Sequence, residues 1–381
     1  MTSYLRDTTL ALFLLFVCRG HCAAGAAENG PRIRVAISRN VSSLKLKTSS
    51  RIYSQEVKSG QKYLLLGNAS YDVRSTGKGI AVAGQELSSP IRLLAPEGVE
   101  RIRLGGNLYK GDVLIKAAPG GLLDIIEYLS LEEYLYGVLP AEMSPGWPLE
   151  ALKAQAVASR TYAMKFINPA RDYDITNGAE MQVYTGVSKV NSRIMEAVNS
   201  TRGEVLKYKG RLVTAFFHAC CGGHTASVKS AWGEDIIKPL YGVADPFCSP
   251  SRHYRWEFYL SSADLLKFIQ SRGSTALKIK NMRIHQKDRS GRTVSFKFTT
   301  DKSPTVVKTT DLRKHFGAFE FRSTYIIGIS PVKSGYELAG RGWGHGVGMC
   351  QEGARYMALK GRPYRKILRH YYPGAAITDY E

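Results

Sequence analysis

An alanine-rich run that Trp147-Pro148 opens and that extends to about Phe166 is the feature that most constrains how this chain folds. Proline is tolerated at the first position of a helix, so we expect a helix to begin at Pro148. Small side chains allow this helix to pack closely against its neighbours. Gln155, Ser159 and Tyr162 follow one another at i, i+4 and i+7, which places a polar stripe along one face. The alanines of the run are Ala151, Ala154, Ala156, Ala158 and Ala163.

A lone carboxylate, Glu142, lies just before this helix. Residues 131–139 have the apolar spacing of a short helix, and we expect Pro140 to end it. Glu142 would then lie on a short turn between that break and Trp147. The residue types alone leave two roles open for it: a cap or surface carboxylate, or an acid that takes part in chemistry.

Composition and charge limit the classes of protein that need to be considered. The chain has 381 residues, of which 44% are hydrophobic and 22% are charged, so it has enough apolar residues for one large or two ordinary folded domains. Its net charge of +21 predicts attraction to a polyanion, such as nucleic acid, an anionic membrane or a cell-wall polymer. The basic residues are scattered and lack the clustering with aromatic residues that a nucleic-acid interface needs, so we expect no nucleic-acid partner.

The N-terminus has the pattern of a secretory signal peptide. Arg6 precedes an apolar run over residues 10–18, and Ala24-Gly25-Ala26 forms a cleavage site of the A-x-A type. The apolar run is too short to span a bilayer, and no later stretch is apolar enough to do so. We therefore predict a signal peptide over residues 1–26 and an exported mature chain without a transmembrane segment. Its location would be the periplasm, the cell wall or the extracellular space.

Short strands and turns dominate the first part of the mature chain. Ile33, Val35 and Ile37 are spaced two apart, and Leu44 and Leu46 alternate with lysines in the same way. Further strands are expected at residues 62–66, 79–82, 91–94 and 112–115. The pattern indicates a β-rich module over residues 32–120.

Helical and extended patterns are mixed after residue 120. Further helices are expected at residues 191–201, from Ser261/Ser262 to Gly273, at 311–316 with Thr310 as cap, at 351–359 and at 364–372. Further strands are expected at residues 204–208, 212–217, 254–260, 278–284 and 292–299, the last two as a hairpin. We therefore predict an α+β fold. The β-rich N-terminal module packs on a mixed α/β domain, residues 121–381, which has a central helix and antiparallel strands.

Four cysteines follow the predicted signal peptide: Cys220, Cys221, Cys248 and Cys350. An even number in an oxidising compartment permits disulfides, and adjacent cysteines rarely pair with each other. The pattern H-x-C-C-x-x-H that begins at His218 lacks a usual zinc-ligand spacing. A disulfide and a turn that lines a site through His218 are therefore favoured over zinc.

Two glycine-rich turns also need an explanation. Gly222-Gly223 allows positive φ or close backbone approach. Residues 340–354 carry alternating glycines around Trp343 and His345, a pattern that only function or close packing would require. This loop does not lie in a βαβ unit with a downstream acidic residue, which argues against a nucleotide site.

Several motifs together carry a family resemblance. They lie at residues 140–143 (Pro-Ala-Glu-Met), 147–158, 218–225 (His with Gly-Gly-x-Thr), 342–349 (Gly-Trp-Gly-His-Gly-Val-Gly-Met) and 371–374 (Tyr-Tyr-Pro-Gly). In this order they resemble the stage II sporulation protein D family, SpoIID/LytB, over residues 32–372. The resemblance implies a peptidoglycan lytic transglycosylase that cleaves the β-1,4 bond between N-acetylmuramic acid and N-acetylglucosamine. The products carry anhydro-muramyl ends, and the preferred glycan is stripped of its stem peptides.

Such a reaction suits a single carboxylate. Ordinary glycoside hydrolysis uses two carboxyl groups. In a lytic transglycosylase the nucleophile is the muramyl 6-hydroxyl, so one glutamic acid can first donate a proton and then accept one. By this resemblance Glu142 is the catalytic acid and base. The expected substrate-binding residues are Gln155, Arg160, Tyr162, His218, Gly222, Gly223, Trp343, His345 and Gln351.

The chain departs from the family pattern in two places. Relatives that bind zinc do so with Cys and His just before a Q-x-Y element, and residues 173–181 here contain neither, so we expect that zinc site to be absent and no cofactor to be needed. The glycine loop usually continues Met-Ser-Gln, whereas this chain has Cys350, either as a small substitution for serine or as a disulfide partner of Cys220 or Cys221. By the family's commoner pairing we expect a disulfide between Cys221 and Cys248.

A non-enzymatic role is the alternative. Other family members enhance a cell-wall amidase, so the chain could bind peptidoglycan without cleaving it and stimulate such a partner. Peptidoglycan glycan strands are the expected partner in both cases.

Overall fold

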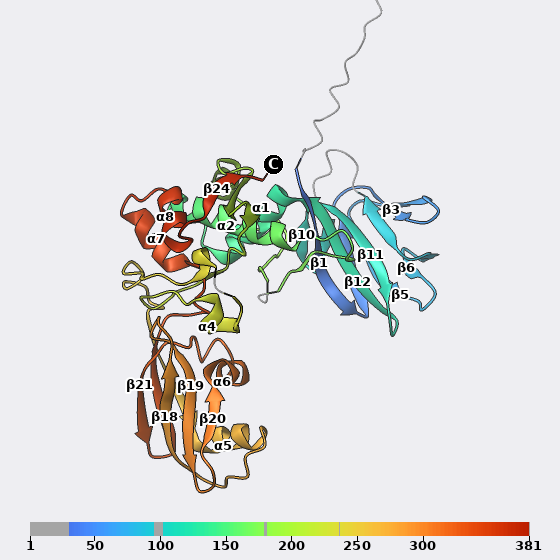
Figure 1. Cartoon of the computed structure of the whole chain (residues 1–381). Coiled ribbons are helices and arrows are strands. Elements are labelled where there is room, and N and C mark those ends of the chain that lie inside the picture. Colours follow the sequence, from blue (N-terminus) through green and yellow to red (C-terminus); the bar gives the residue numbers. More distant parts are fainter. Residues whose placement is uncertain (1–29, 95–101, 179–180, 236, 381) are drawn as a thin grey trace, which may run out of the picture. The chain divides into compact units, whose positions relative to one another are not determined.

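The computed structural model describes residues 30–94, 102–178, 181–235 and 237–380, and Figure 1 shows its helices and strands. The predicted signal peptide, residues 1–26, lies outside the described residues. From Pro31 onward the chain forms one compact unit. It combines α-helices with sheets that are mostly antiparallel, which confirms the predicted α+β class.

Two sheets form the N-terminal module, and the alternating apolar residues predicted there face its core. Leu46 and Val73 of one sheet and Ile91 and Ile115 of the other belong to one buried cluster. The first sheet has the order β13 (Ile175–Thr176), β1 (Arg32–Val41), β12 (Leu122–Ser130), β11 (Asp112–Ala118), β8 (Ile91–Leu94), β3 (Ile52–Glu56), β4 (Lys62–Leu65). The second has the order β10 (Asn107–Tyr109), β9 (Ile102–Leu104), β2 (Ser43–Thr48), β5 (Ala69–Ser75), β6 (Ile80–Val82), β7 (Gln85–Leu87). Because β12 pairs with both β1 and β11, the first sheet extends beyond residue 120.

The first helix, α1 (Leu131–Glu142), starts where β12 ends. Ser130 and Glu133 form a capping box, which satisfies backbone N–H groups at this end. The prediction that Pro140 ends the helix is wrong. Pro140 lies in the last turn, where its missing N–H costs a single hydrogen bond, and the helix continues to Glu142.

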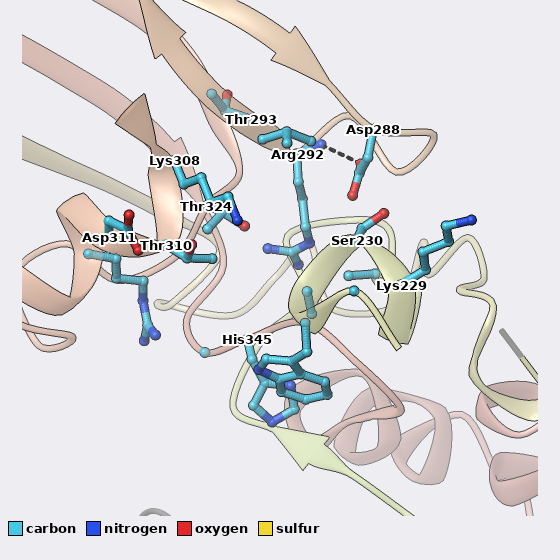
Figure 2. Close-up of a pocket in the computed structure, with 17 residues that line it drawn as sticks. Lys229, Ser230, Asp288, Arg292, Thr293, Lys308, Thr310, Asp311, Thr324 and His345 are labelled. Carbon is cyan, nitrogen blue, oxygen red and sulfur yellow. Dashed lines mark hydrogen bonds between the residues drawn. The ribbon is translucent and has the colours of Figure 1, made fainter. Parts of the chain in front are cut away.

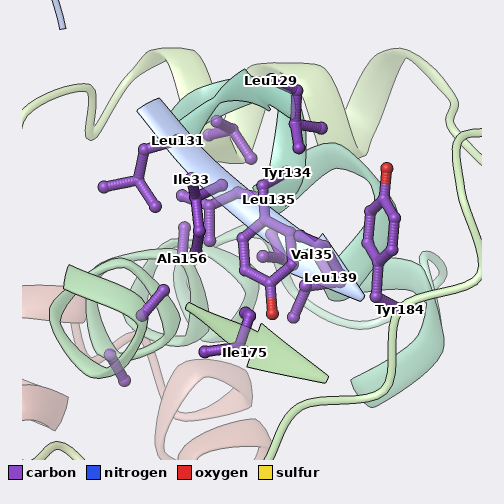
Figure 3. Packing of buried hydrophobic residues seen from close by; sticks show 14 of the residues in the cluster. Ile33, Val35, Leu129, Leu131, Tyr134, Leu135, Leu139, Ala156, Ile175 and Tyr184 are labelled. Atoms are coloured by element: carbon purple, nitrogen blue, oxygen red, sulfur yellow. The ribbon is translucent and has the colours of Figure 1, made fainter. Parts of the chain in front are cut away.

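The predicted central helix is confirmed as α2 (Leu149–Phe166). Its alanines from Ala151 to Ala163 are fully buried, and α2 packs against α1 and three other helices, α3 (Ser192–Asn199), α7 (Gln351–Leu359) and α8 (Tyr364–Tyr371). Figure 3 shows Tyr134 and Leu135 of α1 packed beside Val35 of β1 and Ile175 of β13. These contacts join the N-terminal sheet to the helices in one core.

A second hydrophobic core lies within residues 256–338. It is built from two three-stranded antiparallel sheets and two helices, which Figure 1 colours orange to brown. The predicted hairpin is confirmed by the pairing of its two strands, β18 and β19. The elements of this part are β17 (Arg255–Ser261), α5 (Ser262–Gln270), β18 (Ile279–Lys287), β19 (Thr293–Thr300), β20 (Thr305–Lys308), α6 (Thr309–Phe316), β21 (Ile326–Val332) and β22 (Gly335–Arg341).

Two local predictions need correction. The strand expected at residues 212–217 is interrupted, because only its ends pair, in β15 (Arg211–Leu212) and β16 (Phe217–His218). The cap expected at Thr310 lies inside α6, whose N-cap is Lys308. The remaining elements are β14 (Glu204–Tyr208), α4 (Val228–Trp232), η1 (Lys238–Leu240), β23 (Met349–Cys350) and β24 (Ala376–Asp379).

No helix within the described ranges is both long and apolar enough to cross a membrane.

Candidate functional site

A cavity of about 570 Å³ brings together residues from distant parts of the chain. Its volume lies in the range of ligand sites. Its wall combines the end of α1, the C-terminal part of α2, the segment after residue 180, β16, α4, α6 with the segment after it, the glycine loop and the start of α7. It contains six of the expected site residues: Glu142, Tyr162, His218, Trp343, His345 and Gln351.

Glu142 is the one carboxylate among the described residues that line this cavity. The backbone N–H of Val183 donates to its Oε1 at 3.0 Å, and the Gln351 side chain is a second hydrogen-bond partner. Burial raises the pKa of Glu142 above its ordinary value, and these two hydrogen bonds oppose that rise by stabilising the carboxylate. Near neutral pH the group is therefore closer to its protonated form than an exposed glutamate.

A chain of side-chain amides continues from Glu142 into the core. Gln351 Nε2 donates to Gln155 Oε1 at 3.4 Å, and Gln155 Nε2 donates to Ser159 Oγ at 2.9 Å. Gln155 and Ser159 are fully buried, so the polar stripe predicted on α2 faces this network. Gln155 therefore orients Gln351 and does not line the cavity itself.

The segment Gln182-Val183-Tyr184 positions Glu142, and our sequence prediction missed this role. Tyr134 Oη donates to Gln182 Oε1 at 3.0 Å, and Tyr184 Oη donates to a carboxylate oxygen of Glu127 at 2.7 Å. The side chains on both sides of Val183 are thus fixed in the core, so its N–H points at Glu142. The Q-x-Y pattern in an otherwise polar loop was the available signal.

His345 is held in one neutral tautomer. Its Nδ1 accepts a hydrogen bond from the Val347 N–H at 3.1 Å, so its proton is on Nε2, which donates to the Phe217 carbonyl oxygen at 2.9 Å. Burial, with smaller effects of Arg313 and Arg292, lowers the pKa of His345 to about 4. The imidazole is therefore uncharged at neutral pH.

His218 presents an unused acceptor. Its Nδ1 lies 3.1 Å from the Val347 carbonyl oxygen, which can only accept, so the proton is on Nδ1. Nε2 is buried and has no hydrogen-bond partner in the part of the chain that the structure describes. Burial, then the neighbouring His345 and Arg292, holds the pKa of His218 well below its ordinary value. A ligand hydroxyl is the kind of donor that would satisfy this nitrogen.

The glycine loop packs directly on β16, as its alternating glycines suggested. Gly344 and Gly348 have φ values of 114° and 71°. A Cβ at Gly348 would lie 1.9 Å from the Phe216 carbonyl oxygen, and one at Gly344 would lie 2.8 Å from Cβ of His218. Larger residues are therefore excluded here.

Aromatic side chains form much of the cavity wall. The Phe216 ring lies 4.6 Å from that of Trp232 and 5.8 Å from that of Tyr162. Trp232 is 46% exposed and Phe319 is 77% exposed, and the Phe319 ring lies 5.9 Å from that of Trp343. Such faces pack well on the apolar faces of flat ligands and sugar rings.

Comparisons with known proteins agree with the motifs. The model of the stage II sporulation protein family, SpoIID, matches residues 120–208, which include Glu142 and α2. An uncharacterized protein of Brachyspira hyodysenteriae is 38% identical over 72% of this chain and 78% of its own length. Stage II sporulation protein D of Bacillus subtilis is 27% identical over 71% of this chain and 82% of its own. The chain belongs to the SpoIID family.

Two further matches were found for this SpoIID family member. The amidase enhancer of Bacillus subtilis is 31% identical over 65% of the chain, but the match covers only 40% of that larger protein. The model of a domain of unknown function, DUF8618, matches residues 236–348, a range that contains the second core.

The side chain of Arg160, an expected substrate-binding residue, lies outside the cavity. Arg160 is fully buried and donates to both carboxylate oxygens of Glu132, at 2.8 and 2.7 Å. It also donates to the carbonyl oxygens of Glu204 and Val198. All three guanidinium nitrogens thus donate to protein groups, which supports a structural role for Arg160.

Gly222 and Gly223 also lie outside the cavity, and their expected role in substrate binding stays a prediction. Both have positive φ, and a Cβ on Gly222 would lie 2.7 Å from Cβ of Arg341. These glycines allow the turn after β16 to approach the strand that leads into the glycine loop.

A second cavity, of about 550 Å³, shares Trp232, Arg313, Gly344 and His345 with the first. Figure 2 shows the Arg292 side chain extending from the Asp288 turn toward His345. The second cavity thus adjoins the first and is also lined by Asp288, Arg292 and Thr293 from the part of the chain that holds the second core.

The four cysteines within the described ranges, Cys220, Cys221, Cys248 and Cys350, are buried free thiols. The Sγ atoms of Cys221 and Cys248 are 3.4 Å apart, which is longer than the ~2.05 Å of a disulfide bond. Their pairing therefore stays a prediction. The predicted absence of zinc before the Q-x-Y element also stays a prediction, since residues 179–180 lie outside the described ranges.

Proposed function

We propose that this SpoIID family member is a peptidoglycan lytic transglycosylase that uses Glu142 as its single acid and base. The observation that carries the proposal is a lone carboxyl group with a raised pKa in a cavity lined by aromatic and neutral imidazole side chains. The names of two relatives, a sporulation protein and an amidase enhancer, support a role at the cell wall.

In the proposed reaction the acid form of Glu142 donates its proton to the oxygen of the β-1,4 bond. The muramyl 6-hydroxyl attacks the anomeric carbon of the same sugar while the C–O bond to N-acetylglucosamine breaks. The Glu142 carboxylate then takes the proton of that hydroxyl and returns to the acid form. The products are an anhydro-muramyl end and a free 4-hydroxyl, and no water is consumed.

The surroundings of Glu142 suit both halves of this cycle. Burial favours the protonated form that the first step needs, because a charged carboxylate is poorly solvated there. The Val183 N–H and Gln351 stabilise the carboxylate that forms when the proton leaves. Neutral His345 and His218 add no positive charge that would lower the pKa of Glu142.

The other side chains that line the cavity would bind the sugar rings. The Nε2 acceptor of His218 can take a hydrogen bond from a hydroxyl or an acetamido N–H. Trp232 and Phe319 would pack on sugar rings at the mouth. The net charge of +21 would attract the polyanionic cell wall, to which we propose the chain is exported. We further propose that it prefers glycan without stem peptides.

Mass spectrometry of the products tests the proposal. Intact sacculi and sacculi treated with an amidase are incubated with the wild type and with Glu142→Gln, which keeps the shape of the side chain but cannot donate the proton. We expect anhydro-disaccharides from the amidase-treated sacculi with the wild type and none with the variant. A fully active Glu142→Gln protein would refute the assignment of the acid.

The amidase enhancer from Bacillus subtilis favours one alternative, a wall-binding protein that stimulates an amidase. This role predicts no anhydro product from either type of sacculus. It also predicts that the chain sediments with sacculi and raises the rate of a partner amidase, with Glu142→Gln as effective as the wild type.

A further inference from the structure

Four potential metal ligands lie together in the core outside the cavity. They are Cys221, Asp245, Cys248 and Cys350, and their ligand atoms all lie within 4.8 Å of one another. All four residues are buried. They come from the turn after β16, from the loop after η1 and from β23, so they are brought together only by the fold.

The sulfur atoms are surrounded by donors that stabilise thiolates. Sγ of Cys350 accepts from the backbone N–H of Cys221 at 3.2 Å and of Gly353 at 3.3 Å. Sγ of Cys221 lies 3.4 Å from the Gly223 N–H, which donates to it. Hydrogen bonds of this kind orient metal ligands and offset their charge.

The Asp245 carboxylate is also fixed by hydrogen bonds. Asp245 accepts from the Tyr371 hydroxyl at 3.0 Å and, through its other oxygen, from the Phe247 N–H at 2.9 Å. A Cβ at Gly353 would lie 2.3 Å from Oδ2 of Asp245, so the helix start that follows Cys350 must approach this carboxylate closely. The site is therefore packed from all sides by fixed groups.

A buried positive charge lies beside the cluster. Arg292 is 2% exposed, and its Nη2 donates to the Cys221 carbonyl oxygen at 2.6 Å. Its Nε and Nη1 are buried and have no hydrogen-bond partner among the described residues. A buried guanidinium that keeps two nitrogens without a hydrogen-bond partner is costly, even with the Tyr325 ring 5.4 Å from it. Three thiolates and a carboxylate around a divalent ion carry a net negative charge, which would offset it.

We propose that Cys221, Asp245, Cys248 and Cys350 bind a zinc-class divalent cation. Thiolate ligands favour zinc over magnesium or calcium, which prefer oxygen. Four protein ligands close the tetrahedron, so the site is structural. With Zn–S bonds of about 2.3 Å, tetrahedral sulfurs lie roughly 3.8 Å apart, close to the 3.4 Å between Cys221 and Cys248.

The cation would fix two walls of the cavity relative to each other. Strand β16 pairs in parallel with β23, which places His218 opposite Cys350. Cys221 follows His218 by three residues, and Gln351 follows Cys350 directly. A cation bound to both Cys221 and Cys350 would therefore hold the segment that carries His218 against the segment that carries Gln351. This inference does not rest on the proposed transglycosylase chemistry, because metal content is measured without any substrate.

The test measures metal and thiols in the same preparation. The chain without its predicted signal peptide, residues 1–26, which keeps four of the six cysteines, is purified without chelators. Zinc is determined by elemental mass spectrometry, and free thiols are counted by alkylation and intact mass after unfolding with a chelator. We expect about one equivalent of zinc and four alkylated cysteines. Metal-free protein with a Cys221–Cys248 disulfide would overturn the proposal, as would four free thiols that fail to bind added zinc.

Variants identify the ligands. Cys248→Ser and Asp245→Asn should lose zinc to a competing chelator at least tenfold more readily than the wild type. Cys220→Ser is the matched control: Cys220 is buried and adjacent but outside the ligand set, so its variant should retain zinc. Loss of zinc in this control would contradict the assignment. Because a variant can fail to fold, Co²⁺ is also substituted into the wild type, where thiolate-to-cobalt absorption is expected and its absence would refute thiolate ligation.

Discussion

Replacing Gln351 by leucine should move the pH dependence of the proposed reaction. The Gln351 side chain hydrogen-bonds Glu142 and lowers the pKa of Glu142 against the larger effect of burial. Without that hydrogen bond the carboxylate is less stable, so the pKa of Glu142 rises further. The acid form must be present for the first step, so activity is lost as pH increases through this pKa. The variant should therefore stay active to higher pH than the wild type.

The size of the shift follows from the strength of one hydrogen bond. A hydrogen bond to a charged group contributes about 1.5–3 kcal/mol, and Glu142 keeps its second donor, the Val183 N–H. Each pKa unit corresponds to about 1.4 kcal/mol. Because Glu142 is half-buried and partly solvated, we take the lower end and expect an alkaline limb shifted upward by about one unit.

The assay is kcat/KM for release of anhydro-disaccharides from amidase-treated glycan, measured across pH, since this parameter reports the groups of the free enzyme. Gln286→Leu is the matched control, because Gln286 is an exposed glutamine of β18 and should leave the profile unchanged. An alkaline limb that stays in place or moves to lower pH in Gln351→Leu, with activity retained, would refute the reasoning about Glu142.

The remaining predictions concern binding and stability. His218→Ala should lower kcat/KM about tenfold while the unfolding midpoint changes little, because it removes an acceptor for the sugar; an unchanged kcat/KM would contradict this. Trp232→Ala should raise KM more than it lowers kcat, measured with soluble glycan strands, since Trp232 is half-exposed at the cavity. Glu132→Gln should destabilise the fold by roughly 3–5 kcal/mol in urea unfolding, because it leaves the buried Arg160 without its carboxylate; a loss below about 1 kcal/mol would refute the structural role. Burial raises the pKa of Glu127 to about 7, above its unfolded value, so the stability it contributes is fully present at acidic pH and is lost as pH rises through about 7; Glu127→Gln should flatten this part of the stability curve.

Local periodicity predicted the elements that its own residues determine. The alanine run became α2, which ends at Phe166 as expected and begins one residue later than expected, with Pro148 as its N-cap. Residues 351–359 became α7, because helix spacing and caps are properties of neighbouring residues. The same approach missed the end of α1, since the cost of Pro140 depends on where in the helix it lies. It also missed β12, which is buried by pairing on both sides.

Long-range packing decided which candidate residues meet. Tyr162 and Arg160 are two positions apart on α2, and only Tyr162 lines the cavity, because Arg160 faces Glu132. A charged residue within a motif is indistinguishable from a ligand contact until its partner is known. Spacing was equally misleading for the cysteines: Asp245 was not considered, and Cys221 meets Cys350 only because β16 pairs with β23.

The position of Glu142 at the end of α1 explains why a single carboxyl group suits the proposed chemistry. The C-terminal end of a helix carries partial negative charge, and the last turn of α1 contains no basic residue. The helix end therefore disfavours the carboxylate and adds to the effect of burial, which keeps a proton available. The Val183 N–H, presented by the anchored Q-x-Y segment, then stabilises the carboxylate from outside the helix. The helix end and burial favour the acid form of Glu142, and the Val183 N–H favours its carboxylate. Under the proposed chemistry Glu142 can therefore fill both of the roles that two carboxyl groups share in ordinary glycoside hydrolysis.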